Sequence, residues 1–126
     1  MTAHIMNTDI DPDRPATLSP IFLEDILRDG LSYDGVIISD DMQMGAITSQ
    51  FGFDEAIIKA VNAGCDLLIF SNNGSEYDED IARKAAGVIF SAVNNIISLF
   101  SITHGPAIKT KGKLLPISIF LIFTIT

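Results

Sequence analysis

Two adjacent carboxylates, Asp40 and Asp41, stand directly after a run of apolar residues in the segment GVIISDDMQMGA, residues 35 to 46. Aspartates that follow a strand can serve as nucleophiles or bind a divalent cation. The ordinary alternative is a pair of aspartates that bond to nearby backbone in a turn. Which of these holds depends on the elements that position the two side chains.

The other residues that commonly bind metals or attack substrates are few: His4, His104 and Cys65. Neither histidine has a cysteine or histidine partner at ligand spacing, so no metal site is predicted, and His104 receives no role. Cys65 is the single cysteine, which excludes an internal disulfide and fits a reducing compartment. Its place beside Gly64 predicts a small buried thiol. The chain has neither a glycine-rich phosphate loop nor a G-x-S-x-G nucleophile elbow.

Charge is distributed unevenly along the 126 residues, whose net charge is −8. Residues 1–80 hold all sixteen acidic residues and three basic ones, whereas residues 81–126 hold five basic residues and no acidic one. The acidic part argues against a nucleic-acid partner, because affinity for the phosphate backbone rests on clustered Lys and Arg. A chain of this length with 48% hydrophobic residues can form one modest domain.

Alternating strand and helix patterns surround the two aspartates. Unbroken apolar runs predict strands buried on both faces, and apolar residues at helical spacing predict helices. Ser19 and Gly30 are the expected caps of the first helix. Asp54 and Gly64 are those of the second. The expected elements are a strand at 1–5, a helix at 20–29, a strand at 35–39, a helix at 54–63, a strand at 66–70 and a helix at 79–97.

This order of elements predicts an α/β fold with parallel strands. In such folds the loops after the carboxyl ends of the strands build the functional site, whether the sheet closes into a barrel or stays open. His4 and the residues after it, residues 39–44 and residues 71–73 occupy that position. Asp40 and Asp41 are therefore expected at the functional edge of the sheet. Since consecutive residues of an extended chain point to opposite sides, Asp41 is interpreted as a group that caps its own loop.

Four motifs follow one another along the chain: MTAHI, PATLSP, L…YDGVIISDDMQMGAI and EAIIKAVNAGCDLLIFSNN. In this order and spacing they resemble the last part of the N-terminal catalytic domain of glycoside hydrolase family 3, nearest its β-N-acetylhexosaminidase branch. The resemblance implies a (β/α)8 TIM-type barrel, of which this stretch would supply about the last three βα units. On this basis residues 1–97 are interpreted as a fragment of the catalytic barrel.

The resemblance also implies a function. Asp40 stands at the position of the family's catalytic nucleophile, which attacks the anomeric carbon in a retaining mechanism. The implied activity is that of a β-N-acetylglucosaminidase (β-N-acetylhexosaminidase), with a carbohydrate substrate and no cofactor, in carbohydrate metabolism or peptidoglycan recycling. Met44 matches the family's methionine after the nucleophile and is a candidate substrate contact, although such a methionine commonly fills a core gap. His4 is a second candidate contact, and a histidine bonded to local backbone is the alternative.

Members of this branch are similar in carrying an Asp-His acid/base pair and a Lys-His sugar-binding segment upstream, and the 126 residues contain no counterpart of either. We therefore expect a truncated family member. The alternative function is that of a catalytically inactive fragment or a non-enzymatic α/β binding module. A phosphotransfer module with Mg²⁺ on the two aspartates is disfavoured, because DDMQM lacks the D-x-D spacing of phosphatase-like aspartyl nucleophiles.

Residues 98–126 are expected to form a divergent apolar and basic tail, explained by a frameshifted or fused end. Its last apolar stretch, residues 114–126, is too short for an ordinary spanning helix of about 20 residues. We expect no membrane contact from it, with insertion into a membrane surface or a partner groove as the alternative. No secretory signal is visible, so a cytoplasmic protein is expected. Open sheet edges predict marginal stability or self-association.

Overall fold

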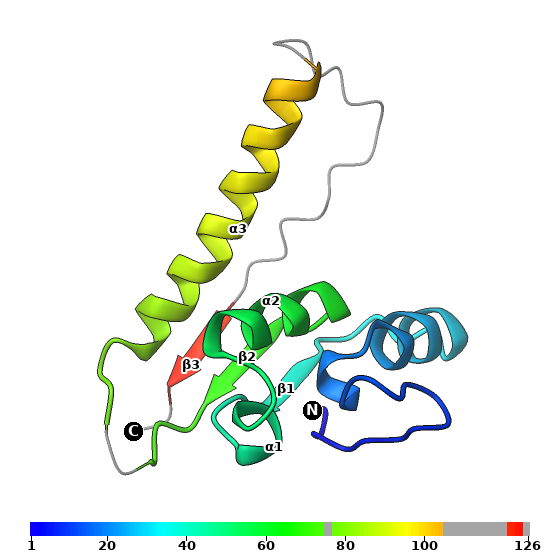
Figure 1. The fold of residues 1–126 in the computed structure, drawn as a ribbon. Helices are drawn as coiled ribbons and strands as arrows, with labels where there is room; N and C mark the ends of the chain where they lie inside the picture. Colours follow the sequence, from blue (N-terminus) through cyan, green and yellow to red (C-terminus); the bar gives the residue numbers. More distant parts are fainter. Residues whose placement is uncertain (75–76, 105–120, 125–126) are drawn as a thin grey trace.

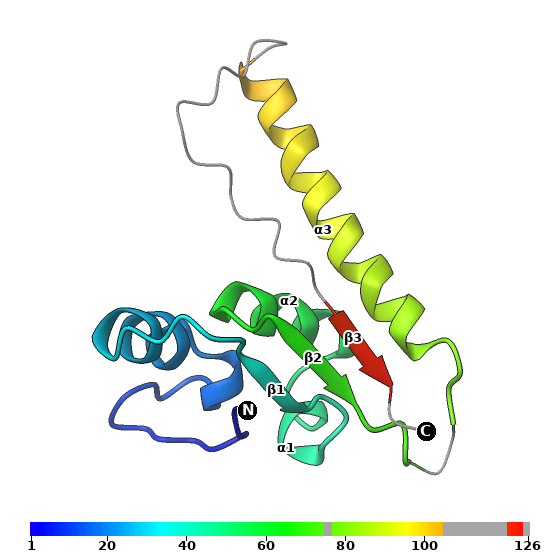
Figure 2. The ribbon, with the colours of Figure 1, turned by 180° about the vertical axis from the view of Figure 1, so that it is seen from behind.

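A parallel sheet with the strand order β1-β2-β3 forms the centre of the computed structural model, which describes residues 1–74, 77–104 and 121–124 (Figure 1). Both strand pairs are parallel, which confirms the predicted α/β class. Helix α2 covers one face of the sheet, and from behind the strands lie in front of it (Figure 2). In chain order the elements are η1 (Ala16–Leu18), η2 (Ile21–Gly30), β1 (Ile38–Asp41), α1 (Gly45–Thr48), α2 (Phe53–Ala63), β2 (Leu67–Phe70), α3 (Ile81–His104) and β3 (Leu121–Thr124).

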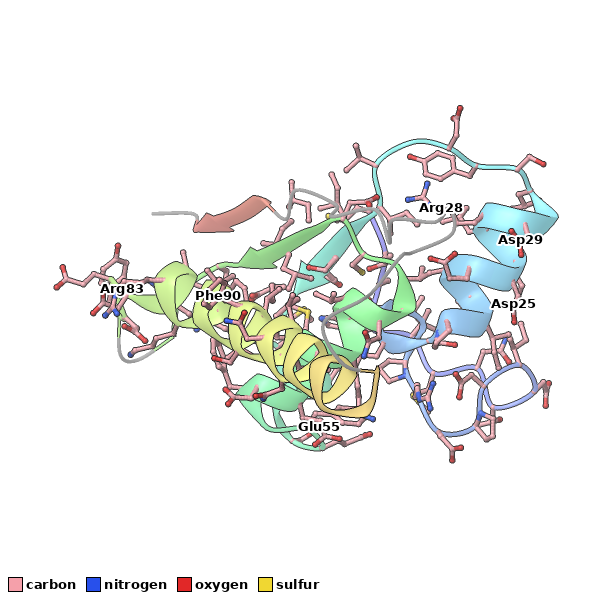
Figure 3. All side chains as sticks on the ribbon, turned by 90° about the horizontal axis from the view of Figure 1, so that it is seen from above. Asp25, Arg28, Asp29, Glu55, Arg83 and Phe90 are labelled. Atoms are coloured by element: carbon pink, nitrogen blue, oxygen red, sulfur yellow. The ribbon has the colours of Figure 1, made fainter. Side chains whose placement is uncertain are left out.

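Strand β1 begins at Ile38, so the predicted strand at 35–39 is wrong in its first half. Side chains from elsewhere take up two backbone groups of that half, although the Ile37 carbonyl accepts backbone amides at the start of the β2 segment. Asp66 Oδ2 accepts the Ile37 amide at 2.8 Å, and Arg28 Nη1 donates to the Gly35 carbonyl at 2.6 Å. Arg28, which projects from η2 (Figure 3), and Asp66 are themselves paired at 2.8 Å. This ion pair sets where the strand ladder starts.

Helix η2 is the predicted helix at 20–29, found as a wider π-type helix. Pro20 holds the cap position of η2 in place of the predicted Ser19, whose Oγ still accepts the Phe22 amide at 3.4 Å. The Ser19 hydroxyl also donates to the buried Asp11 carboxylate at 2.5 Å, and this hydrogen bond lowers the pKa of Asp11. Gly30 was expected after the helix and is its last residue, because the Leu31 amide reaches back to the Ile26 carbonyl at 2.9 Å.

Helix α2 ends as predicted but begins differently. Gly64 follows it with φ 106°, a left-handed backbone that glycine adopts without strain, and its amide donates to the Val61 carbonyl. Asp54 is wrong as the predicted cap, since Gly52 holds that position and Asp54 lies in the first turn. There its charge still favours the positive end of the helix dipole.

The N-terminal segment runs beside β1 without forming a strand. The Thr2 amide donates to the Ile38 carbonyl at 2.7 Å, whereas the Ala16 amide donates to the Ile5 carbonyl at 2.9 Å. The predicted strand at 1–5 is therefore wrong, because a ladder needs repeated bonds with one partner strand. The short helix α1, between the two aspartates and α2, was not expected from the sequence.

Helix α3 continues beyond the predicted 79–97. The expected tail, residues 98–126, contributes the end of α3 and strand β3, and its other residues lie outside the described ranges. No helix within the described part of the chain is long and apolar enough to cross a bilayer. On α3, Phe90 is 68% exposed (Figure 3).

The hydrophobic core lies between α2 and the sheet. Phe70 and Ile57 have no exposed surface, and the Phe70 ring centroid lies 5.7 Å from that of Phe53. Along the first two strands buried and partly buried residues alternate, so the predicted burial of these strands on both faces is wrong, and one face of the sheet is covered more fully than the other. The covered positions are Ile37, Ser39, Leu68 and Phe70, and the half-exposed positions are Ile38, Asp40, Leu67 and Ile69.

Cys65 begins the connection from α2 to β2 and is 2% exposed, which confirms the predicted buried thiol. Its Sγ donates to the Thr17 carbonyl at 3.6 Å. Burial, together with the neighbouring Asp66 carboxylate, raises the pKa of Cys65 to about 12. The side chain therefore stays an uncharged thiol and packs as a small apolar group.

Candidate active site

A bulge at the end of β1 places the two aspartates. Ile38 pairs with Leu67 and Asp41 pairs with Ile69, so β1 has one residue more than β2 between the two pairs. The Ile69 amide donates to Ser39 Oγ at 2.9 Å within this irregular stretch. Bulges of this kind occur at barrel rims and beside active sites, where they redirect a side chain. Asp40 therefore lies within the bulged strand, not after it as predicted, and simple alternation no longer describes Asp41.

The Asp40 carboxylate is partly buried and sparsely bonded. Its Oδ1 accepts the Asp41 amide at 2.8 Å. Among the described residues no other protein group donates a hydrogen bond to it. A carboxylate with most of its acceptor capacity unused can still interact with a substrate.

Asp41 has the opposite surroundings, since three protein donors bind its carboxylate. Oδ1 accepts the Ser71 amide at 3.0 Å and the Gln43 amide at 3.1 Å, and Oδ2 accepts the Ser71 hydroxyl at 2.6 Å. Partial burial raises the pKa of Asp41, but these hydrogen bonds outweigh it and hold the pKa below its ordinary value. Asp41 is thus an ionised group that joins two loops, which confirms its interpretation as a loop-capping residue.

The loop after β2 is tied to the same strand end. Gln43 Oε1 accepts the Asn72 amide at 2.6 Å. Asn72 is buried with a left-handed backbone of φ 52°, and its side chain bonds to both the amide and the carbonyl of Asp78. Sequence reasoning placed residues 71–73 at this edge but missed Gln43, whose partner lies 29 residues away.

His4 and Met44 take different places around this strand end. His4 Nε2 lies 2.8 Å from the Asp41 carbonyl oxygen, and Nδ1 lies 3.1 Å from Thr17 Oγ1. Met44 precedes α1 and is 45% exposed, while Met42 is the methionine buried in the core. The structure therefore brings His4 to Asp41 and leaves Met44 at the surface beside the two aspartates.

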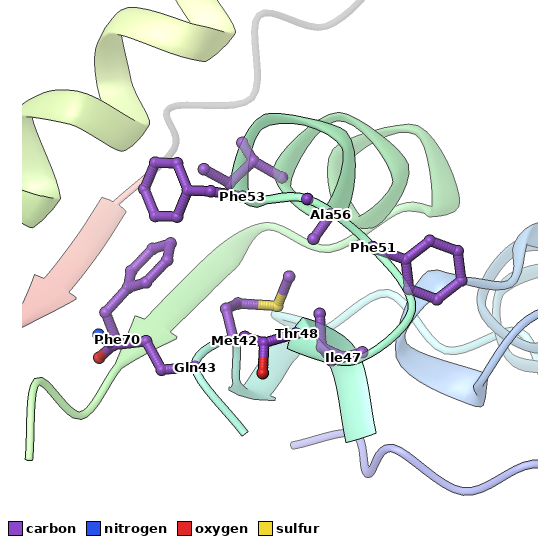
Figure 4. Close-up of a pocket in the computed structure, with 10 residues that line it drawn as sticks. Met42, Gln43, Ile47, Thr48, Phe51, Phe53, Ala56 and Phe70 are labelled. Atoms are coloured by element: carbon purple, nitrogen blue, oxygen red, sulfur yellow. The ribbon is translucent and has the colours of Figure 1, made fainter. Parts of the chain in front are cut away.

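A separate cavity of about 340 Å³ lies between α1, α2 and the end of β2 (Figure 4). Its walls are mainly aromatic and aliphatic, from Phe51, Phe53, Phe70 and Met42, with Gln43 as a polar member. Neither aspartate lines this cavity, whereas Phe70, a covered position of the sheet, does. The cavity and the aspartates are therefore distinct features. Within residues 1–74, 77–104 and 121–124 no cluster of His, Cys, Asp and Glu could hold a metal ion.

Comparison with known sequences places these features in a family. Residues 1–97 match the Glycosyl hydrolase family 3 N terminal domain. A β-hexosaminidase of Tolumonas auensis is 40% identical over 73 residues, which are 58% of this chain and 22% of that protein. A β-hexosaminidase of Hydrogenovibrio crunogenus is 37% identical over 83 residues, or 66% of this chain and 23% of that protein. The chain thus spans about a fifth of the length of the curated relatives that it matches.

Solved structures give the same result. A glycoside hydrolase family 3 β-N-acetylglucosaminidase from Paenibacillus sp. str. FPU-7 superposes with a TM-score of 0.58 at 32% identity, covering 91% of this chain and 24% of that one. CbsA from Thermotoga neapolitana superposes with a TM-score of 0.65 at 28% identity, covering 75% of this chain and 20% of that one. The resemblance seen in the sequence motifs is confirmed by sequence and by structure.

Proposed function

Because this chain belongs to glycosyl hydrolase family 3, we propose that it carries the nucleophile-bearing part of a retaining β-N-acetylhexosaminidase, with Asp40 as the nucleophile. The observation that supports this role most directly is the contrast between the two aspartates. Three protein donors occupy Asp41, while Asp40 accepts only the amide of its neighbour among the described residues. The carboxylate that is free to react is therefore that of Asp40.

The reaction needs an ionised carboxylate at a fixed point. In a retaining glycosidase the carboxylate attacks the anomeric carbon, a glycosyl-enzyme forms, and an acid protonates the departing oxygen; water activated by the same acid/base group then releases the sugar. Asp40 would form and later lose the glycosyl ester. Its place in a strand end fixes the direction of attack better than a free loop would.

Strands β1 and β2 lie within the residues that match the family, and their parallel pairing fits a part of a (β/α)8 barrel, of which we propose that this chain forms about the last three βα units. The acid/base and the groups that bind most of the sugar would then belong to the other units of the barrel. The substrate class that we propose is a β-linked N-acetylglucosamine glycan, such as a peptidoglycan-type fragment. The β-hexosaminidase relatives support this choice.

The experiment is hydrolysis of a dinitrophenyl β-N-acetylglucosaminide by the 126-residue chain and by its Asp40→Ala variant. The dinitrophenolate departs without protonation, so formation of the glycosyl-enzyme does not depend on the acid catalyst, whereas release of the sugar is slow without the same group as a base. We expect a burst of dinitrophenolate and then slow turnover in the parent chain, neither in Asp40→Ala, and the parental result in Asp25→Ala, a control at an exposed aspartate of η2. Equal turnover in the parent and Asp40→Ala would refute the nucleophile, and no turnover in either would favour an inactive fragment or a binding module.

A further inference from the structure

His4 connects the N-terminal segment to the end of β1 through both nitrogens of its ring. Nε2 lies 2.8 Å from the Asp41 carbonyl oxygen, which can only accept, so Nε2 carries a hydrogen. Nδ1 lies 3.1 Å from Thr17 Oγ1 and, in the neutral ring, accepts the hydroxyl hydrogen of Thr17. Thr17 Oγ1 in turn lies 2.8 Å from Thr2 Oγ1 and accepts from it. Neither ring nitrogen is left for a sugar hydroxyl.

The far side of this chain of hydrogen bonds is fixed in the core. Thr17 belongs to η1 and has no exposed surface. Its carbonyl oxygen accepts the buried Cys65 thiol at 3.6 Å, and η1 packs against α2. Because Thr17 is fixed in the core, its hydrogen bond also fixes the imidazole ring of His4. The ring in turn restrains the Asp41 carbonyl through Nε2.

The end of β1 needs such support because the bulge interrupts the ladder there. A bulge leaves its extra residue outside regular strand pairing, so the ladder alone does not fix Asp40. Asp41 is held by Ser71 at its carboxylate and by His4 at its carbonyl, which also accepts the Met44 amide at 3.1 Å. The Asp41 amide donates to Asp40 Oδ1 at 2.8 Å, so a fixed Asp41 also orients the Asp40 carboxylate.

We propose that His4 is a positioning residue for the Asp40 carboxylate, acting through the Asp41 carbonyl, and that it is not a substrate contact. This inference rests on the proposed role of Asp40 as the nucleophile. A reacting group has to be held within about 0.5 Å of its productive place, and a misplacement of about 1 Å costs about 100-fold in rate. Loss of the His4 donor is expected to cause a displacement of this kind.

The first test follows the Asp40 carboxyl carbon and the Asp41 amide by NMR in the 126-residue chain. His4→Phe removes both ring nitrogens, His4→Asn carries an amide too short to reach the carbonyl, and His4→Gln restores a donor near the place of Nε2. We expect both resonances to move in the Phe and Asn variants and to return to the parental values in the Gln variant. His104→Phe replaces the other histidine and is the matched control, which should leave both resonances in place.

Two outcomes overturn the proposal: resonances that stay unchanged in His4→Phe and His4→Asn, or resonances that move equally in all three His4 variants. If His4→Phe does not fold, as judged by its thermal melt, the contrast between Asn and Gln decides by itself. A further spectrum, of the imidazole nitrogens, shows whether the Nε2 hydrogen of His4 is present in the parent chain, and its absence is a third outcome that overturns the proposal.

Kinetics then separate positioning from substrate contact. With the dinitrophenyl substrate, His4→Asn is expected to lower kcat about 100-fold with little change in KM, and His4→Gln to recover most of the rate. A raised KM with unchanged kcat is the signature of a lost substrate contact and contradicts positioning. A parent chain without turnover refutes the proposed function alone, because the NMR comparison still decides whether His4 positions Asp40.

Discussion

The covered and the half-exposed positions of the sheet have opposite physical roles. Ser39, Leu68 and Phe70, among the covered positions, have no exposed surface, and Leu68 and Phe70 belong to one hydrophobic cluster with side chains of α2. The half-exposed positions alternate with them along the same two strands and include Asp40. Packing free energy is therefore concentrated on one side of the sheet, and the group proposed to react is on positions that contribute little to packing.

The largest expected effect comes from truncating a covered residue. Phe70→Ala removes a fully buried ring that touches Phe53, and should lower the free energy of unfolding by about 3–5 kcal/mol. Ile69→Ala, one residue away at a half-exposed position, should cost about 1–2 kcal/mol, because less apolar area leaves water there. Urea titration of both variants measures the difference. Equal losses would show that the two sets of positions do not differ energetically.

A smaller loss of unfolding free energy is expected from Asp41→Asn. The variant keeps the size of the side chain and removes its negative charge, so it tests whether the charge stabilises the contact between the two loops. Hydrogen bonds to a charged group contribute more than neutral ones, so the variant should lose about 2 kcal/mol at pH 7. The folded pKa of Asp41 is lowered, so this stability is present above the unfolded pKa of about 3.9 and is lost as the pH falls through the folded value.

Thermal melts from pH 7 to pH 2 measure this pH dependence. The gap in Tm between the parent chain and Asp41→Asn should be widest above about pH 5 and should close as Asp41 becomes protonated. Asp11, whose pKa is also lowered, titrates in both chains and drops out of the difference. A gap that does not change with pH would mean that ionisation of Asp41 does not stabilise the loops.

The smallest effect on stability is expected from Asp40→Asn. The Asn oxygen can still accept the Asp41 amide, and no other described donor is lost, so the free energy of unfolding should change by no more than about 0.5 kcal/mol. Chemical denaturation beside the Asp41→Asn variant makes the comparison. A loss as large as that of Asp41→Asn would show that Asp40 is a structural residue like its neighbour.

The parts of the fold that depend on local chemistry could be predicted from the sequence. Gly64 ends α2 because only glycine takes a φ of 106° without strain, and the hydroxyl of Ser19 reaches the Phe22 amide in the first turn of η2. The position of the two aspartates at a strand end followed from the apolar run before them. Helix ends and apolar runs of this kind depend on residues that are only a few positions apart in the sequence.

The parts that depend on distant partners could not be predicted. The start of β1 is set by Asp66, which is 29 residues from Ile37, and His4 meets Asp41 across 37 residues. The bulge follows from the paired registers of two strands and leaves no mark in either segment alone. These long-range contacts decide which aspartate is free and which is bound, and so the details of the candidate site come from the structure.

The buried thiol of Cys65 is a chemical reporter of local unfolding at the junction of α2 and β2. Alkylating reagents attack the thiolate, and a thiol with a pKa of about 12 in a closed core offers almost none of it. Labelling therefore has to wait until the junction of α2 and β2 separates, and its rate under native conditions reports the frequency of opening when alkylation is faster than reclosing. Since the chain has a single cysteine, mass spectrometry of the intact protein separates molecules that have opened and been alkylated from those that have not.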